Sequence, residues 1–225
     1  IRGGAAEWSS LGWGPDEFAE RYGDYDVRFY DSSQFVSRGT RARVLANMSV
    51  GSYIAALADQ ELPAFENRYT DLVRAVCGGV RMESLPVYSV RQFRVVSLGA
   101  KRTGVGFHNH DEGWLAQVHG RKGWFLSVAR ERPSNELHPC HMSRDRLPPG
   151  MAYCVVKPTD ILYIPRGVWH ATCNLDGWTL GIGGGTDVSA LPPLQLAVYD
   201  GDETAVRRLV EAGASAAELS DASRA

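Results

Sequence analysis

Three histidines in this chain stand at spacings that would let them bind one metal ion. His108 and His110 are two residues apart in a segment that is expected to be a β-strand, and side chains two apart on a strand point to the same face. His170 follows a second expected strand, residues 160–164. Three imidazoles that converge from two strands form a facial set for a divalent transition metal and leave positions for water or substrate. The sequence therefore predicts a metal centre at His108, His110 and His170.

A nearby carboxylate gives a second ligand set. Glu112 has the same strand parity as His108 and His110, so His110 and Glu112 completed by His170 also satisfy the spacing. A single histidine in a strand is more often a hydrogen-bonded residue than a ligand. The interpretation as a metal centre therefore depends on the residues around the three histidines.

These surrounding residues resemble the two motifs of the cupin superfamily. Segment 165–174, Pro-x-Gly-x-x-His-x-x-x-Asn, resembles the second cupin motif, and His-x-His at 108–110 resembles the metal-binding pair of the first. Segment 117–126 is similar to the JmjC branch of that superfamily. The resemblance covers residues 49–186 and implies a mainly β fold: a double-stranded β-helix, or jelly roll, with N-terminal helices and a C-terminal helical hairpin.

The resemblance also implies a metal, Fe(2+) or another divalent ion such as Zn2+, at His108, His110 and His170. Most JmjC oxygenases have a carboxylate where this chain has His110, although one type of JmjC protein shares the His-x-His pattern. A third neutral imidazole in place of the carboxylate leaves the ligand set with one negative charge fewer, which weakens Fe(2+) binding. The twelve-residue spacing from His108 to Gly120 favours the ligand set that contains His108 and His110 over the set that contains His110 and Glu112.

By the same resemblance the cosubstrate would be 2-oxoglutarate, whose far carboxylate needs a cation and hydroxyl partners. Lys122 matches the family's lysine by position, and the alternative is a solvated lysine in a turn. Ile182 stands where the family often has a small hydroxyl residue, and the family's asparagine falls on position 113 or 114. Thr172 and Asn174 are candidate substitutes, but Thr172 can also serve only in packing and Asn174 only in a turn.

Composition limits the classes of function. The chain has 225 residues, 44% hydrophobic and 22% charged, with a net charge of -2, which is ordinary globular material for one domain and a small appendage. No basic run attracts nucleic acid and no apolar run is long enough to span a membrane. The four cysteines form no Cys-x-x-Cys pair. We expect them to be free and buried, although two disulfides are compatible with an oxidising compartment.

Periodicity predicts the elements that position these residues. Helices are expected at 15–22, after an N-cap at Ser49, and at 69–76, and a strand is expected at 26–30, followed by a polar loop at 31–42. Eight short strands without intervening helices then indicate a sandwich or barrel. They are expected at 93–98, 106–110, 114–119, 123–128, 152–156, 160–164, 168–175 and 178–182.

Two segments lie outside this strand pattern. Residues 130–150 contain four prolines and Asn135, which predict a surface insert, and His138 and His141 within it lack the further ligands that a zinc site needs. Residues 193–215 resemble an ankyrin repeat, and a single repeat must pack on the barrel or on further repeats. The predicted domains are an N-terminal extension at 1–48, a barrel at 49–186, and a linker with the hairpin at 187–225.

Three functions are compatible with these features. The first is an Fe(2+)- and 2-oxoglutarate-dependent oxygenase that hydroxylates a protein or a small molecule. The second is a catalytically inactive module that binds a partner protein through the ankyrin-like tail, and the third is a three-histidine cupin enzyme that does not use 2-oxoglutarate. Nucleic acid and membrane are not expected partners. For localisation the cytoplasm or nucleus is slightly favoured, and the resemblance also admits the endoplasmic-reticulum lumen.

Overall fold

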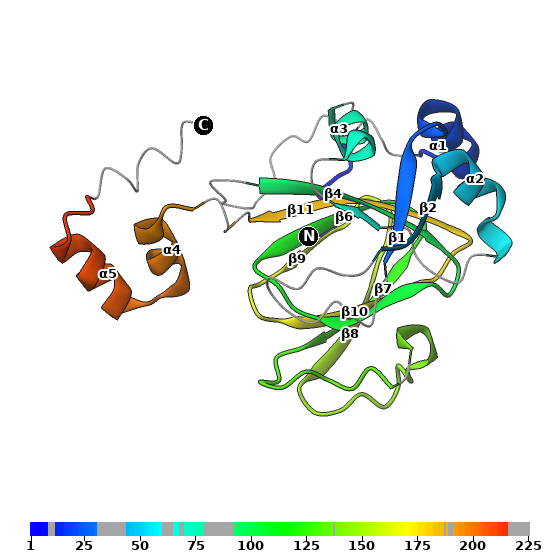
Figure 1. Cartoon of the computed structure of the whole chain (residues 1–225). Coiled ribbons are helices and arrows are strands. Elements are labelled where there is room, and N and C mark those ends of the chain that lie inside the picture. Colours follow the sequence, from blue (N-terminus) through cyan, green and yellow to red (C-terminus); the bar gives the residue numbers. More distant parts are fainter. Residues whose placement is uncertain are drawn as a thin grey trace.

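Two antiparallel sheets form the centre of the protein in a computed structural model, which describes residues 1–8, 12–30, 44–59, 65–67, 70–78, 92–136, 138–186, 188 and 191–215 (Figure 1). The five-stranded sheet has the order β3 (Phe65–Asn67), β4 (Gln92–Ala100), β11 (Trp178–Thr186), β6 (Gly113–His119), β9 (Ile161–Ile164). The four-stranded sheet has the order β5 (Gly104–His108), β10 (Trp169–Asn174), β7 (Lys122–Ser127), β8 (Met151–Val156). This is the double-stranded β-helix that the sequence predicts.

Three apolar cores stack through the molecule because successive side chains of a strand point to opposite faces. The inner core lies between the sheets, where Val95 and Leu115 of one sheet meet Trp124 and Val156 of the other. The neighbouring residues Val96 and Ala116 point to the outer face of the five-stranded sheet and belong to a second core. On the outer face of the four-stranded sheet, a third core contains the buried residues Phe107, Phe125, Trp169 and Ala171.

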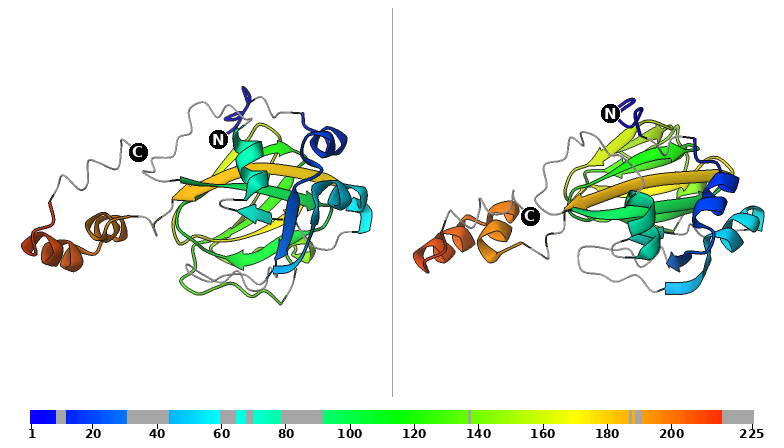
Figure 2. Two further views of the ribbon diagram at one scale, coloured as in Figure 1. Left: turned by 45° about the horizontal axis from the view of Figure 1, so that its top comes forward. Right: turned by 90° about the horizontal axis from the view of Figure 1, so that it is seen from above.

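The N-terminal part covers the outer face of the five-stranded sheet (Figures 1 and 2). Its elements are α1 (Pro15–Tyr22), β1 (Asp26–Tyr30), β2 (Val44–Ser49), α2 (Val50–Ala55), the 3-10 helix Leu57–Asp59 and α3 (Asp71–Gly78). Helix α2 begins where the Ser49 hydroxyl accepts a hydrogen bond of 3.1 Å from the Ser52 backbone N–H, as the predicted N-cap requires. Phe18, Tyr53 and Val76 are fully buried here, and burying each such side chain contributes about 1.5–3 kcal/mol.

The structure confirms the predicted elements with shifted ends. Helix α1 and strand β1 have the predicted bounds, whereas α3 begins and ends two residues later than predicted. The predicted polar loop at 31–42 lies outside the described residues, and strands β2 and β3 were not predicted. The most consequential shift is in β5, which ends at His108. His110 therefore lies beyond the strand and not within it, as the spacing argument assumed.

The segment after β7 is an insert, as predicted, and contains one 3-10 helix, Pro139–His141. Met142 and Leu147 of the insert pack against the third core. Cys140 forms a disulfide with Cys173 of β10, while Cys77 and Cys154 are free. The expectation that all four cysteines are free is wrong for this pair, because the insert folds back over the sheet and brings the two Cα atoms to 5.0 Å.

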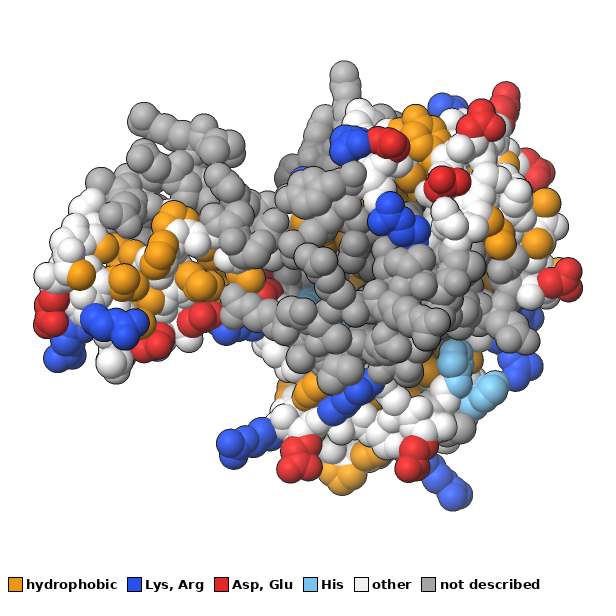
Figure 3. All heavy atoms as spheres, viewed as in Figure 1, with side chains coloured by type: hydrophobic (Ala, Val, Ile, Leu, Met, Phe, Trp, Pro, Cys, Tyr) orange, Lys and Arg blue, Asp and Glu red, His pale blue; other side chains and the backbone are white. Residues whose placement is uncertain are grey.

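Helices α4 (Pro193–Asp200) and α5 (Glu203–Glu211) form the expected helical hairpin at one side of the barrel (Figures 1 and 2). Leu194 and Ala197 of α4 are buried, whereas α5 has no buried residue. Val198 and Val210 are about half exposed. Hydrophobic side chains gather on the visible face of this hairpin (Figure 3). None of the described helices is both long and apolar enough to cross a bilayer.

Candidate metal centre

The three predicted histidines meet at one end of the barrel. His108 and His170 are directly opposite each other on the paired strands β5 and β10, and His110 lies two residues beyond the end of β5. One ring nitrogen from each residue lies within 4.8 Å of those of the other two. The ring centroid of His170 is 4.1 Å from that of His108 and 4.6 Å from that of His110. Within the described chain this is the one group of three or more potential ligands at such distances.

Backbone carbonyls fix which nitrogen of each ring faces the others. Nδ1 of His108 lies 2.8 Å from the Gly106 carbonyl oxygen, and Nδ1 of His170 lies 2.9 Å from that of Val168. Nδ1 of His110 lies 2.5 Å from the carbonyl oxygen of Asp111. A carbonyl oxygen can only accept, so each Nδ1 donates its proton. In a neutral imidazole this leaves Nε2 with a lone pair, which is the arrangement of metal-ligating histidines.

Burial keeps these imidazoles neutral. Desolvation, and then the neighbouring His110, lower the pKa of His108 to about 3. Desolvation also lowers the pKa of His110, and desolvation and the two neighbouring rings lower that of His170 well below its usual value. All three rings are therefore uncharged at neutral pH, as a metal ion requires of its ligands.

The Pro-x-Gly motif has a direct structural role beside the histidines. Val168 N–H donates to the Pro165 carbonyl at 3.3 Å, which closes a turn between β9 and β10. Gly167 has φ +76° in this turn, a conformation that glycine adopts without strain. Its N–H donates to the His110 carbonyl at 3.1 Å. The turn that leads into His170 therefore also holds the backbone of His110.

Glu112, the alternative ligand, is held away from the three rings. Its carboxylate accepts hydrogen bonds from the Tyr163 hydroxyl at 2.8 Å and the Thr186 hydroxyl at 2.5 Å, and it does not belong to the histidine group. Tyr163 is 40% exposed because its hydroxyl reaches this carboxylate at the rim. Trp114, Trp124 and Trp169 are buried.

Lys122 is buried inside the barrel, so the interpretation as a solvated turn lysine is wrong. The side chain is 4% exposed, and its ammonium group donates to the Ser97 hydroxyl at 2.7 Å. Desolvation lowers the pKa of Lys122 to about 7. A neutral hydroxyl is poor compensation for a buried positive charge, so an anionic group placed beside Lys122 would stabilise it. Ser97 itself was not predicted, because nothing in its local sequence distinguishes it.

Thr172 and Asn174 already have structural partners. The Thr172 hydroxyl accepts from the Val105 N–H at 3.2 Å, and the Asn174 amide donates to the Thr103 hydroxyl at 2.9 Å. The Asn174 side-chain oxygen is buried without a partner among the described residues. Ile182 is buried in the core on the outer face of its sheet, so it does not point toward Lys122.

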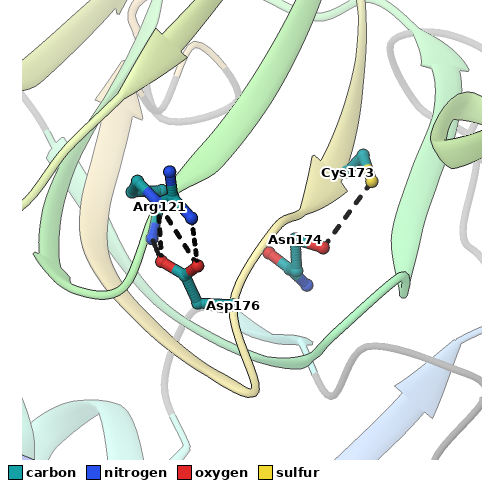
Figure 4. Close-up of polar contacts among 4 residues, drawn as sticks. All are labelled: Arg121, Cys173, Asn174 and Asp176. Atoms are coloured by element: carbon teal, nitrogen blue, oxygen red, sulfur yellow. Dashed lines mark hydrogen bonds and ion pairs between the residues drawn. The ribbon is translucent and has the colours of Figure 1, made fainter.

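A solvent-exposed ion pair joins two turns at the end of the barrel that carries Lys122. The Arg121 guanidinium contacts the Asp176 carboxylate at 2.7 Å, and the Arg121 N–H donates to the same carboxylate (Figure 4). The guanidinium holds the pKa of Asp176 below its usual value. The dashed line from the Cys173 sulfur to the Asn174 carbonyl in Figure 4 is a close contact of 3.6 Å, since a disulfide sulfur has no proton to donate.

His138 and His141 lie side by side in the insert, with ring centroids 5.7 Å apart. The Cys140 N–H donates to Nδ1 of His138, and Nε2 of His141 lies 3.2 Å from the Arg102 guanidinium. Within the described residues they belong to no group of three metal-ligand side chains. The structure therefore gives no support to a zinc site here.

Comparison with known proteins agrees with this architecture. A family model for the JmjC domain matches residues 81–190. The matched segment contains all three histidines and Lys122, so the resemblance that the two motifs indicate is confirmed there. The ankyrin resemblance of the C-terminal hairpin is not shown by any comparison.

Among known proteins, the chain is similar to JmjC domain-containing protein 8 of Homo sapiens, with 37% identity over 100 residues, covering 40% of this chain and 35% of that protein. The Mus musculus protein of the same name is 34% identical over 100 residues, covering 40% and 34%. The chain thus spans about a third of the length of these relatives. A crystal structure of the Escherichia coli ribosomal oxygenase YcfD covers 76% of this chain and 43% of its own, with 20% identity and a TM-score of 0.44.

Proposed function

We propose that His108, His110 and His170 bind one divalent transition metal, Fe(2+) in the first place and Zn2+ as the alternative. The observation that carries the proposal is the set of three Nδ1 contacts with backbone carbonyls, which leaves three neutral nitrogens facing a common centre. Three lone pairs at this distance cannot satisfy one another, because none of them donates a proton. A cation would satisfy all three.

We further propose that the barrel is an oxygenase that uses 2-oxoglutarate to hydroxylate a protein or a small molecule. With Fe(2+) and 2-oxoglutarate bound, O2 would be the oxidant: one oxygen atom would enter the C–H bond of the substrate and the other the succinate that forms as 2-oxoglutarate loses CO2. Lys122 is the candidate anchor for the far carboxylate, because among the described residues its buried ammonium group bonds only to the Ser97 hydroxyl. The Trp124 ring, 5.9 Å from the His170 ring, would exclude water from the centre. Its buried Nε1 has no partner within the described structure and is a further candidate donor.

A binding module with a structural metal is the second candidate. Two observations favour it. The histidine group contains no carboxylate, and the Thr172 hydroxyl and the Asn174 amide group already bond to Val105 and Thr103. In this case the metal would fix the end of the barrel. The half-exposed Val198 and Val210 of the helical hairpin would then contact a protein partner. If the barrel is an oxygenase, we expect a protein partner to bind at the same two residues.

Anaerobic titration separates these proposals. Metal-free protein is titrated with Fe(2+), and the bound metal is measured by calorimetry and elemental analysis, with His170→Ala as the test variant and His141→Ala as the control for loss of a surface histidine. We expect one ion per chain for the wild type and the control, and none for His170→Ala. Unchanged binding by His170→Ala would overturn the metal centre. 2-Oxoglutarate is then added, and a visible charge-transfer band supports the oxygenase, whereas bound Fe(2+) without such a band supports the structural metal.

A further inference from the structure

Arg166 stands between the metal end of the barrel and the C-terminal helical hairpin. It is the middle residue of the Pro-x-Gly turn, and its guanidinium contacts both sides. On the barrel side, Nε lies 3.6 Å from a carboxylate oxygen of Asp111. On the hairpin side, it contacts the Asp200 carboxylate at 2.7 Å and donates to the Tyr199 carbonyl at 3.1 Å, and it lies over the Tyr199 ring, 5.1 Å from the centroid.

The hairpin contacts match what the end of a helix needs. Tyr199 and Asp200 are the last two residues of α4, and Gly201 caps the helix with a left-handed backbone. The last carbonyls of a helix have no intrahelical partner and carry partial negative charge. Arg166 supplies a donor and a positive charge to this end, so its position depends on α4 being docked.

The barrel contact continues directly to a candidate metal ligand. Asp111 is 8% exposed, and its backbone carbonyl is the acceptor for Nδ1 of His110. The group that accepts this proton fixes the tautomer and the direction of the ring. His110 has no strand of its own, since β5 ends at His108. Its ring direction therefore depends on the Asp111 carbonyl more than those of His108 and His170 depend on their acceptors, which lie within or beside paired strands.

We propose that Arg166 is a positioning residue for His110, and that the C-terminal hairpin sets its position. Docked α4 holds Arg166, Arg166 holds Asp111, and the Asp111 carbonyl directs the His110 ring toward the other two histidines. This inference rests on the proposed metal centre. It implies that undocking of the hairpin lowers metal affinity, and by linkage that bound metal strengthens the docking of α4.

The network matters more than its single ion pairs. The Arg166 side chain is 41% exposed, and an isolated ion pair at such exposure contributes little to stability. Three contacts on the hairpin side together restrain the Arg166 guanidinium. Because the side chain is already held, it loses less conformational entropy when it contacts Asp111. We therefore expect a moderate effect on metal affinity, about 3- to 10-fold, which is smaller than the 10- to 100-fold typical of a direct partner of a ligand.

The test is a double-mutant cycle on metal affinity with Co(2+) as the probe. Wild type, Arg166→Ala, Asp200→Asn and the double variant are titrated, with Arg208→Ala and Glu211→Gln as controls that remove the same charges from exposed positions of α5. We expect about 3- to 10-fold weaker binding for each test variant, no further loss in the double variant because both act through one contact, and no change in the controls. Equal affinity of Arg166→Ala and wild type, or additive losses, would overturn the inference. A wild type that binds no Co(2+) would instead contradict the metal centre itself.

A second readout distinguishes positioning from general destabilisation. In the metal-free protein, each of the three Nδ1 protons is held by a carbonyl and is expected to give a slowly exchanging NMR signal. Arg166→Ala should speed the exchange of the His110 proton alone, and Arg166→Lys, which keeps the charge but not the planar fork, should restore it in part. Equal acceleration at all three histidines would show a merely structural role.

Discussion

At the scale of single residues, the backbone partners of the three histidines separate a metal centre from a buried polar cluster. In a packed core, buried polar groups are satisfied by complementary partners. Here each Nδ1 has an acceptor, while the remaining nitrogens come within 4.8 Å of one another as three acceptors. The same reasoning applies to Lys122, whose three potential donors have one hydroxyl partner, Ser97, in the described part of the chain. A cation among the three nitrogens and an anion beside Lys122 would stabilise both groups.

Lys122→Met tests this reasoning, since methionine fills a similar volume without charge. Because its pKa of about 7 lies below the ordinary 10.5, the unfolded chain binds more protons between these values, so wild-type stability should rise as pH increases from 7 to 10. At pH 7 the variant should be more stable than wild type by about 1–4 kcal/mol and should not show this rise. Urea unfolding across the pH range measures both effects.

The same variant should lose affinity for 2-oxoglutarate. A charged hydrogen bond contributes about 1.5–3 kcal/mol, so we expect binding weaker by roughly 10- to 100-fold in calorimetry of the metal-loaded protein. Lys101→Met, at an exposed turn, is the matched control and should bind as wild type does. If Lys122→Met bound 2-oxoglutarate normally, Lys122 would not be the anchor.

At the scale of elements, the insert after β7 is fastened to the strands that carry the histidines. The Asn135 side chain accepts from the Phe107 N–H and donates to the Phe107 carbonyl, next to His108. The disulfide joins Cys140 of the insert to Cys173, three residues after His170. The insert therefore braces β5 and β10 from the face opposite the inner core.

Removal of this disulfide should cost stability, because it closes a loop of 33 residues. The chain-entropy model gives about 3–4 kcal/mol for a loop of this length. Cys140→Ala/Cys173→Ala should show this loss in urea unfolding and should not respond to a reductant. The matched variant Cys77→Ala/Cys154→Ala should keep the disulfide and lose similar stability only on reduction. Detection of four reactive thiols in the non-reduced, unfolded wild type would contradict the bond, which forms only in an oxidising environment.

These elements also show how far the sequence leads. The strands and the Pro-x-Gly turn were predictable, because alternation, turn residues and a glycine at positive φ are local properties. The position of His110 beyond β5 was not, because its ring is directed by a carbonyl and by the turn at Gly167, which is remote in sequence. The disulfide and the Arg166 contacts depend on how an insert and a hairpin fold back. The sequence spacing between Cys140 and Cys173, or between Arg166 and its partners in the hairpin, does not show how the insert and the hairpin fold back.

At the scale of the whole molecule, the end of the barrel that carries the three histidines is where the two sheets, the insert and the hairpin come together. The two sheets meet there through β5 and β10 on one side and the turn after β9 on the other. The N-terminal helices bury the outer face of the five-stranded sheet, the insert braces the other sheet, and α4 contacts the turn. A charge placed among the three rings would therefore act on the stability of the entire barrel.

Acid provides that charge, so the metal-free protein should lose stability as pH falls. The pKa values of His108, His110 and His170 are lowered in the folded state, so below the ordinary value of 6.5 the unfolded chain binds protons that the folded chain refuses. The part of the stability that comes from these neutral rings is fully present above pH 6.5 and is lost as pH falls toward the folded pKa, which is about 3 for His108. For His108 alone we expect a loss of about 2 kcal/mol between pH 6.5 and pH 5. Urea unfolding at these two pH values measures the loss, and His108→Phe should reduce it, whereas His141→Ala, with an exposed ring, should leave it unchanged. A wild type equally stable at both pH values would show that the rings are hydrated and do not form the dry, neutral cluster on which metal binding depends.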